Sequence, residues 1–314
     1  MNKILALDPK AIESIGDWAK IYPFVGHEMG LFMAIFPKKT WTKEFLDQNF
    51  DSKNWGFWDE EKIKEFLISL QKSNSFVSLH SPYESSIDWW ENYSKIDKDK
   101  KENCIVYGRR KASGGLKTLD DLDPRQLIID STIDEKFTPK KLTQRLKIFL
   151  QNTPKIAIVD RHNYLTKLNG KPSPFVEFVK EILDITKLSK CQEIIIYAKY
   201  DPSRYPYMLT DDSIKEQMMK VFDGCITPTY GINYICCTEF QNNQDLHARK
   251  IITNHVVFLL SDSIAGGTYS QTITRVHDDV FRESNLKSWI DQDHGLEVKA
   301  SAVFLNLAKT QPKK

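Results

Sequence analysis

Apolar and polar positions follow two distinct spacings from Thr138 onward. The apolar runs "KIAIVD", "EIIIYAKY" and "INYICCTEF" predict buried strands. Between them, "TPKKLTQRLKIFLQNT", "SPFVEFVKEILDITKL" and "TDDSIKEQMMKVFD" repeat apolar residues at helical spacing, and Thr138 and Ser173 each precede a proline that suits the first position of a helix. Because strands alternate with helices, residues 138–314 are predicted to form an α/β domain on a mixed sheet.

A hairpin is predicted late in this region. The segments "HARKIITN" and "VVFLLSDSI" are apolar enough to be strands, and little more than Asn254 and His255 separates them. The final residues, "KTQPKK", have no apolar spacing and are predicted to be a disordered tail.

The first 94 residues show a different pattern. The clearest helix is "DEEKIKEFLISLQKS", and the segments "DPKAIESIGDWAKIY" and "TWTKEFLDQNF" also have spacings compatible with short amphipathic helices. Residues 1–94 are therefore predicted to be a mostly helical, aromatic-rich unit that recruits a protein partner. Six of the seven tryptophans lie in it: Trp18, Trp41, Trp55, Trp58, Trp89 and Trp90.

Residues 95–137 are predicted to connect the two parts as a charged linker with short strands. The stretch "ENYSKIDKDKKEN" has no apolar period. It leads into "CIVYGRRKASGGLKT", a short strand and a basic loop, and "RQLIIDS" is predicted to be another strand. Arg109 and Arg110 stand beside two glycines in this loop. Two interpretations stay open: a solvated turn, or an anion-binding loop in which guanidinium groups hold phosphate oxygens.

Composition narrows the class of protein without naming a ligand. The 314 residues are 41% hydrophobic and 27% charged, as in soluble globular proteins, and the net charge is only +2. The five cysteines form no CxxC pair, so reduced thiols and a cytoplasmic location are expected. No apolar run approaches the roughly 20 residues that a membrane helix needs.

Candidate chemistry gathers at strand ends in the α/β domain. In "DLHARKIITN", His247 and Arg249 would share one face of a strand, where both could contact one phosphate. Asp160 ends the strand "KIAIVD", and such ends are where sites of α/β sheets form. For each of these residues the alternative is a structural role. Further ligand-binding candidates are Arg161, His162, Tyr164, Arg204 and Thr253.

The order of these motifs resembles the phospholipase D-like superfamily. A strand ending in Asp, a helical crossover, and then a Leu-His-x-Arg segment leading into a hairpin are present as "IAIVDRHNYL", "QDLHARKIITN" and "FLLSDSIAGG". The resemblance covers about residues 138–275. It is strongest to the C-terminal domain found after microtubule-interacting-and-transport modules, and it implies a phospholipase D-like fold over about residues 120–314.

Active members of this superfamily carry His-x-Lys-x4-Asp and need no metal or other cofactor. The resemblance implies that His247 attacks a phosphodiester to form a phosphohistidine and that Arg249 replaces the lysine. Asn254 stands where the aspartate would be, so a carboxylate that orients the imidazole has to come from elsewhere. A second histidine would come from a homodimer or from His162. The candidates for the carboxylate are Asp160, Glu239, Asp245 and Asp262.

Three functions follow from this pattern. The absent aspartate favours a degenerate site that binds a phosphate-bearing ligand, DNA and RNA included. A metal-independent nuclease that acts as a homodimer is the alternative, so enzymatic activity is left open. A protein-interaction component with an inactive cleft is the third. The first 94 residues do not resemble a microtubule-interacting-and-transport module, and a role in prokaryotic genome defence or a mobile element is the expected setting.

Overall fold

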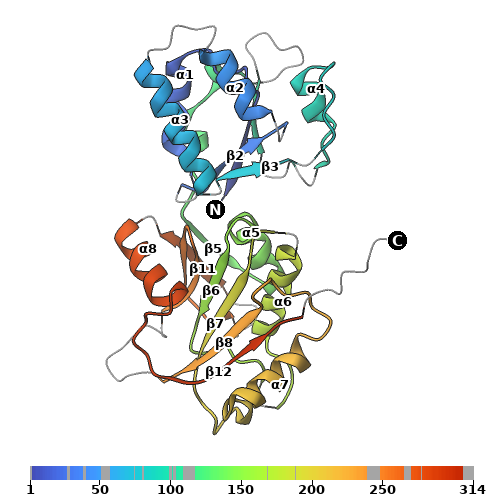
Figure 1. Cartoon of the computed structure of the whole chain (residues 1–314), viewed down its shortest axis with the longest axis vertical. Coiled ribbons are helices and arrows are strands. Elements are labelled where there is room, and N and C mark those ends of the chain that lie inside the picture. The colour runs from blue at the N-terminus through green and yellow to red at the C-terminus, as the bar shows by residue number, and fades with distance from the viewer. Residues whose placement is uncertain are drawn as a thin grey trace. The chain divides into compact units, whose positions relative to one another are not determined.

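The computed structural model describes residues 2–26, 29–37, 40–50, 57–73, 75–79, 81–98, 101, 104–108, 117–167, 169–187, 189–238, 248–264, 270–276 and 278–306. The chain forms two compact units, Met1–Asp130 and Ser131–Lys314 (Figure 1). Residues 95–130, predicted to be mostly linker, thus belong to the first unit, and the boundary precedes position 138 because a strand of the second sheet already begins at Thr132.

The first unit is built on a four-stranded parallel sheet that the apolar pattern did not predict. Its order is β3-β2-β1-β4, with every neighbouring pair parallel. Strands buried on both faces show no alternation of apolar and polar residues, which is why β1 and β2 did not stand out in the sequence. The strands are β1 (Lys3–Leu7), β2 (Leu31–Ile35), β3 (Phe76–Ser78) and β4 (Cys104–Tyr107).

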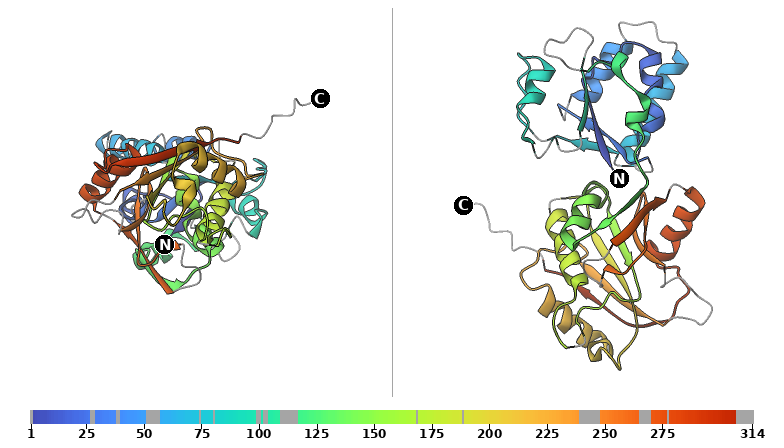
Figure 2. Two further views of the ribbon diagram at one scale, coloured as in Figure 1. Left: turned by 90° about the horizontal axis from the view of Figure 1, so that it is seen from below. Right: turned by 180° about the vertical axis from the view of Figure 1, so that it is seen from behind.

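Helices cover both faces of this sheet. In two opposite views of the molecule, α1, α2 and α3 lie on one side of the strands and α4 on the other (Figures 1 and 2). The predicted helices are present, although the first is short. Their bounds are α1 (Ile15–Ala19), α2 (Trp41–Phe50), α3 (Phe57–Lys72) and α4 (Trp89–Ser94).

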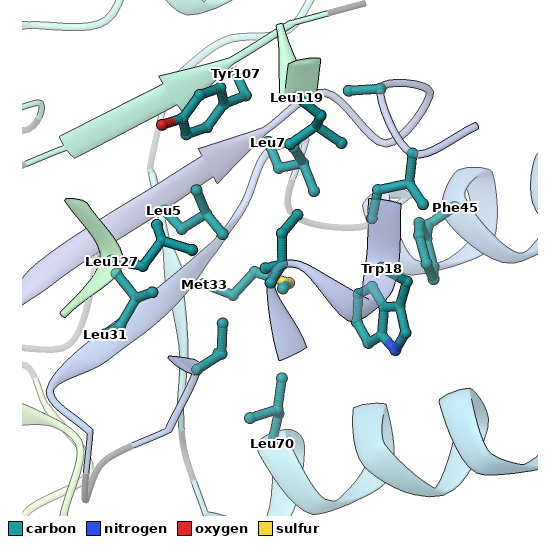
Figure 3. Close-up of a cluster of buried hydrophobic side chains, with 14 of the residues drawn as sticks. Leu5, Leu7, Trp18, Leu31, Met33, Phe45, Leu70, Tyr107, Leu119 and Leu127 are labelled. Carbon is teal, nitrogen blue, oxygen red and sulfur yellow. The ribbon is translucent and has the colours of Figure 1, made fainter. Parts of the chain in front are cut away.

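Aromatic side chains fill the interior of the first unit. Trp18, Trp41 and Trp89 are almost fully buried, and Figure 3 shows Trp18 and Phe45 next to each other in the same buried cluster as Leu5 and Leu7 of β1 and Leu31 of β2. The indole N–H of Trp41 donates to the carbonyl of Leu7 at 2.8 Å, and that of Trp89 to the carbonyl of Phe36 at 2.7 Å. These three tryptophans serve the core, so recruitment of a partner by this unit has no support from them and stays a prediction.

The second unit is the predicted α/β domain with a mixed sheet. Its eight strands have the order β12-β8-β7-β6-β9-β10-β11-β5, in which β6, β7 and β8 run parallel and all other pairs are antiparallel. The strands are β5 (Thr132–Lys136), β6 (Lys155–Val159), β7 (Glu193–Lys199), β8 (Ile232–Cys237), β9 (Arg249–Thr253), β10 (Val257–Leu260), β11 (Ser270–Val276) and β12 (Val298–Phe304).

The predicted hairpin is formed by β9 and β10. The predicted strand in "RQLIIDS" is not formed: Leu127 ends the short 3-10 helix Pro124–Leu127, and the edge strand β5 begins only at Thr132. Proline at the first position of that segment favours a helical turn over a strand start here.

Helices of the second unit lie on opposite faces of its sheet. Helices α5 (Pro139–Gln151) and α6 (Pro174–Thr186) cover one face, and α8 (Asp279–Asn285) covers the other (Figures 1 and 2). The hydroxyl of Thr138 accepts a hydrogen bond from the backbone N–H of Lys141 and so caps α5. Helix α7 (Asp211–Val221) packs against β12, and a π-helical turn, Leu286–Ile290, continues α8.

Candidate functional site

The carboxyl end of β6 lies at a topological switch point of the sheet, where the chain has placed later strands on both sides of β6. From β6 the chain adds β7 and β8 on one side, whereas β9 lies on the other side and runs antiparallel. Position 159 of β6 pairs with position 250 of β9. The same register, continued by one residue, places Asp160 opposite Arg249. Ligands of open α/β sheets bind at such switch points, beyond the carboxyl ends of the parallel strands.

Asp160 is a buried carboxylate at this switch point. Its side chain is only 1% exposed, and its Oδ1 accepts a hydrogen bond from the backbone N–H of His162 at 2.9 Å. Its Oδ2 has no hydrogen-bond partner among the residues that the structure describes. Buried polar atoms are normally satisfied, so an open carboxylate oxygen marks a position where a ligand or a further side chain completes the site.

Asn163 fixes the turn that follows Asp160. Its amide donates to the carbonyls of Ile158 at 3.1 Å and Tyr197 at 2.9 Å, which joins the ends of β6 and β7. Its own backbone carbonyl accepts from the Tyr234 hydroxyl at 2.7 Å. In the sequence, Asn163 is distinguished only by its position three residues after the aspartate that ends a strand. That position alone did not identify it as a residue of the site.

Tyrosine rings and arginines form the rim beside Asp160. The rings of Tyr164 and Tyr205 stack with centroids 4.0 Å apart. Burial, followed by the nearby Tyr205 and Asp201, raises the pKa of Tyr164 to about 12, while Arg161 and Arg204 act to lower it. The phenol therefore stays protonated at neutral pH. These effects place the predicted residues Arg161, Tyr164 and Arg204 close together, and the ring of His162 meets that of Tyr164 edge to face at 6.0 Å.

Arg249 is the first residue of β9 and lies at the carboxyl end of β6. It is half-buried, its Nη1 donates to the carbonyl of Ser261 at 3.2 Å, and its Nε is buried with no described hydrogen-bond partner. Residues opposite each other in an antiparallel pair project to one face, so Arg249 and Asp160 share a face of the sheet. Within the described ranges no ion pair joins them, and the guanidinium keeps donors for an anion.

Thr253 and Asn254 lie at the other end of β9. Four or five residues of a strand separate them from Arg249, a distance of about 15 Å at roughly 3.3 Å per residue. The Oδ1 of Asn254 accepts from the Thr153 hydroxyl at 3.0 Å and from the backbone N–H of Lys155 at 2.9 Å. The Thr253 hydroxyl donates to the carbonyl of Val256 and accepts from its backbone N–H, which closes the turn that leads to β10. Both side chains thus hold the sheet together where β6 begins, and neither meets Asp160.

Several candidates lie outside the described residues. They include His247, Arg109 and Arg110, and the alternative carboxylates Glu239 and Asp245. The remaining alternative, Asp262, follows Ser261 and accepts from the backbone N–H of Ser263 at 2.7 Å. No group of three or more His, Cys, Asp or Glu side chains suited to a metal ion occurs in the part of the chain that is described. Among the described helices, none has the length and apolar character to cross a membrane.

Comparisons with known proteins add nothing to the description of the fold. No protein-family model and no curated protein matches the sequence. Among solved structures, NucT from Helicobacter pylori is similar over 53% of this chain and 99% of its own, with 10% identity and a TM-score of 0.33. TrmBL2, described as an archaeal chromatin protein with a novel mode of DNA binding, is similar over 84% of this chain and 72% of its own, with 10% identity and a TM-score of 0.29. Overlaps this loose support no inference about function, and the mixed α/β architecture rests on the strands and helices themselves.

Proposed function

We propose that the second unit binds the phosphodiester backbone of nucleic acid at the carboxyl end of β6. The observation that carries this proposal is the half-buried guanidinium of Arg249 beside the switch point, anchored through one N–H to Ser261 with its Nε still open. A planar guanidinium with spare donors suits a phosphate better than any other side chain. Arg161 and Arg204, close to Tyr164, extend the positive charge along the rim.

The order of elements supports membership of the phospholipase D-like superfamily as part of this proposal. Strand β6 ends at Asp160, α6 crosses to β7, α7 leads to β8, and the His-x-Arg segment runs into the hairpin of β9 and β10. Under this proposal His247, two residues before Arg249 in the sequence, is a further residue of the phosphate site. The closer relation to domains that follow microtubule-interacting-and-transport modules, the homodimer and the role in genome defence stay predictions.

Binding is tested by fluorescence anisotropy of the full chain with a labelled oligonucleotide in single-stranded and duplex form. Arg249→Ala is expected to weaken binding about 10- to 150-fold, since a charged hydrogen bond to phosphate is worth about 1.5–3 kcal/mol, and to reduce the salt dependence by about one counterion. Arg145→Ala is the matched control, because Arg145 is an exposed arginine on α5 that pairs with Glu135. Salt-independent binding, or equal losses in both variants, would contradict the proposal.

A nuclease activity is the second candidate, and Asp160 is the observation that favours it. An imidazole that attacks phosphorus needs a carboxylate to hold its tautomer, and the open Oδ2 of Asp160 lies at the edge from which β9 begins. The contacts of Asn254 make the absence of an aspartate at this position a weaker argument against nuclease activity. Because Asn254 bonds to Thr153 and Lys155 at the far end of the strand, its identity does not bear on chemistry beside Arg249.

Cleavage is tested on a single-stranded oligonucleotide with EDTA present. If the site is catalytic, product forms without metal, and both His247→Ala and Asp160→Asn reduce the rate at least 100-fold, in line with loss of a nucleophile or its orienting group. Asn254→Asp is expected to leave the rate within about twofold, because the carboxylate can accept the same hydrogen bonds at a distance from the reaction. Absence of cleavage with binding retained would leave the binding function alone. Absence of both would favour the protein-interaction alternative.

A further inference from the structure

Three buried polar atoms near the carboxyl end of β6 have no hydrogen-bond partner among the described residues. They are Oδ2 of Asp160, Oδ1 of Asn163 and Nε of Arg249. The side chain of Asp160 is 1% exposed and that of Asn163 is fully buried. Two of these atoms are acceptors and one is a donor, so a ligand that satisfies all of them offers both an acceptor and hydrogen-bond donors.

The two acceptor oxygens belong to one short turn. The backbone N–H of Asn163 donates to the carbonyl of Asp160 at 3.2 Å, and the backbone N–H of His162 donates to Oδ1 of Asp160 at 2.9 Å. The Asn163 amide nitrogen donates to the carbonyls of Ile158 and Tyr197, which identifies its oxygen as the open atom. The two open oxygens cannot satisfy each other, because a carboxylate and an amide oxygen only accept.

The open donor lies opposite the turn that carries these acceptors. When the register of β6 and β9 is continued by one residue, Arg249 stands opposite Asp160, and both side chains project to the same face of the sheet. Under the proposed function the guanidinium holds a phosphate, so Asp160 meets the part of the ligand next to that phosphate. The sugar-phosphate backbone of DNA has only acceptors there, which would leave the carboxylate oxygen unsatisfied. The backbone of RNA has one further group, the 2′-hydroxyl, which can donate.

We infer that the site at the carboxyl end of β6 takes RNA, whose 2′-hydroxyl donates to Oδ2 of Asp160 while Arg249 holds the neighbouring phosphate. This inference rests on the proposed binding of nucleic acid and names the class of nucleic acid. A site that bonds a ligand hydroxyl with a buried group discriminates against the analogue without it, because the buried group is then left unpaired. A carboxylate oxygen can accept two hydrogen bonds, so this contact is compatible with an imidazole on the same oxygen.

The test compares the affinity of the full chain for labelled single strands of one sequence, made as DNA, as RNA and as 2′-fluoro RNA. The 2′-fluoro strand keeps an RNA-like sugar conformation but lacks the donor. By fluorescence anisotropy, RNA is expected to bind at least about tenfold more tightly than the other two, the size of one charge-assisted hydrogen bond. Equal affinity for RNA and 2′-fluoro RNA overturns the inference, whether or not DNA binds more weakly. Gel electrophoresis checks that each strand stays intact.

Asp160→Asn locates the discrimination in the protein. The amide can keep the bond from the His162 N–H, and its own N–H then replaces the open oxygen. That donor suits the backbone of DNA, so the preference for RNA is expected to fall to within about threefold. Asp201→Asn is the matched control, because Asp201 lies near Tyr164 at the same rim but accepts from the Ser203 hydroxyl at 2.8 Å within its own loop. Loss of this charge should strengthen binding of RNA and DNA alike.

The ratio of RNA to DNA affinity decides between these variants. A ratio that survives Asp160→Asn, or that falls as far in Asp201→Asn, contradicts the role of Asp160. The comparison of ligands on the unmodified chain stands even if Asp160→Asn does not fold, as circular dichroism would show.

Failure of the inference is distinguishable from failure of the proposed function. If RNA and DNA bind equally and Arg249→Ala weakens both, the phosphate site stands and the hydroxyl contact is wrong. If neither strand binds, or if Arg249→Ala leaves binding unchanged, the proposed function is wrong and the inference falls with it.

Discussion

At the scale of single residues, His255 shows how burial sets the charge of a side chain. It lies in the turn between β9 and β10, beside the Thr253 hydroxyl that accepts from its backbone N–H at 3.3 Å. Burial, followed by the nearby cations Arg282 and Lys190, lowers the pKa of His255 to about 4 from an ordinary value of 6.5. The imidazole is therefore neutral in the folded protein at any pH above about 5, and it cannot act as a cation toward a phosphate.

This depressed pKa predicts a loss of stability in acid. The unfolded chain binds a proton at His255 below about pH 6.5 and the folded protein does so only near pH 4, so stability falls as the pH drops through this window. His255→Gln removes this acid destabilisation. It reaches at most about 3 kcal/mol of unfolding free energy, at 1.36 kcal/mol for each unit of difference between the folded and unfolded pKa. Urea unfolding from pH 7.5 to 4.5 should show a shallower decline for His255→Gln than for the wild type. Parallel curves would contradict the assignment.

At the scale of elements, Lys250 links β9 to α8 and the π-helical turn on the face opposite Arg249. Lys250 is nearly buried, and its Nζ donates to Asn285 Oδ1 of α8 at 2.8 Å. The same nitrogen lies 5.6 Å from the ring centre of Phe281 and 5.7 Å from that of Trp289. A cation with two aromatic rings and an amide oxygen thus joins α8 and the following π-helical turn to the sheet.

Removal of this cation is expected to loosen α8 without unfolding the unit. Lys250→Met keeps the apolar stem but leaves the buried Asn285 oxygen without its donor, at a cost of about 1–3 kcal/mol in unfolding free energy. Lys250→Ala also removes the packing of the stem and should cost more. Lys299→Met, an exposed lysine on β12, is the control and should change stability by less than about 0.5 kcal/mol. Chemical denaturation measures all three; equal stability of Lys250→Met and wild type would contradict this role.

At the scale of the whole molecule, the two units have separate cores. The first is centred on β1 and β2 with Trp18 of α1 and Trp41 of α2, and the second on β6, β7 and β9 with Trp289, which follows α8. Units with their own cores can fold independently. The fragment 131–314 is expected to unfold cooperatively and to bind the oligonucleotide within about threefold of the full chain, as circular dichroism and anisotropy can show. A folded fragment without binding would assign part of the nucleic-acid surface to the first unit.

The sequence by itself determined those features of the protein that depend on local burial. The spacing of apolar residues predicted the helices α5, α6 and α7, the strands β6, β7 and β8 and the hairpin of β9 and β10. Each of these elements buries one or both of its sides, so its apolar residues repeat with the period of a helix or of a strand. The position of Asp160 at the end of a strand and of Arg249 at the start of another followed from the same pattern. Their chemistry as carboxylate and guanidinium follows from residue type alone.

Tertiary structure decided which of these residues meet. Strand order and register bring Asp160 and Arg249 to one edge of the sheet and place Asn254 at the other, although Asn254 is closer to Arg249 in sequence than Asp160 is. In the first unit, the same kind of pairing makes a parallel sheet from apolar runs too short to stand out, and it buries Trp18, Trp41 and Trp89. Hydrogen-bonded pairing between strands distant in sequence depends on long-range packing, which no local period of the chain encodes.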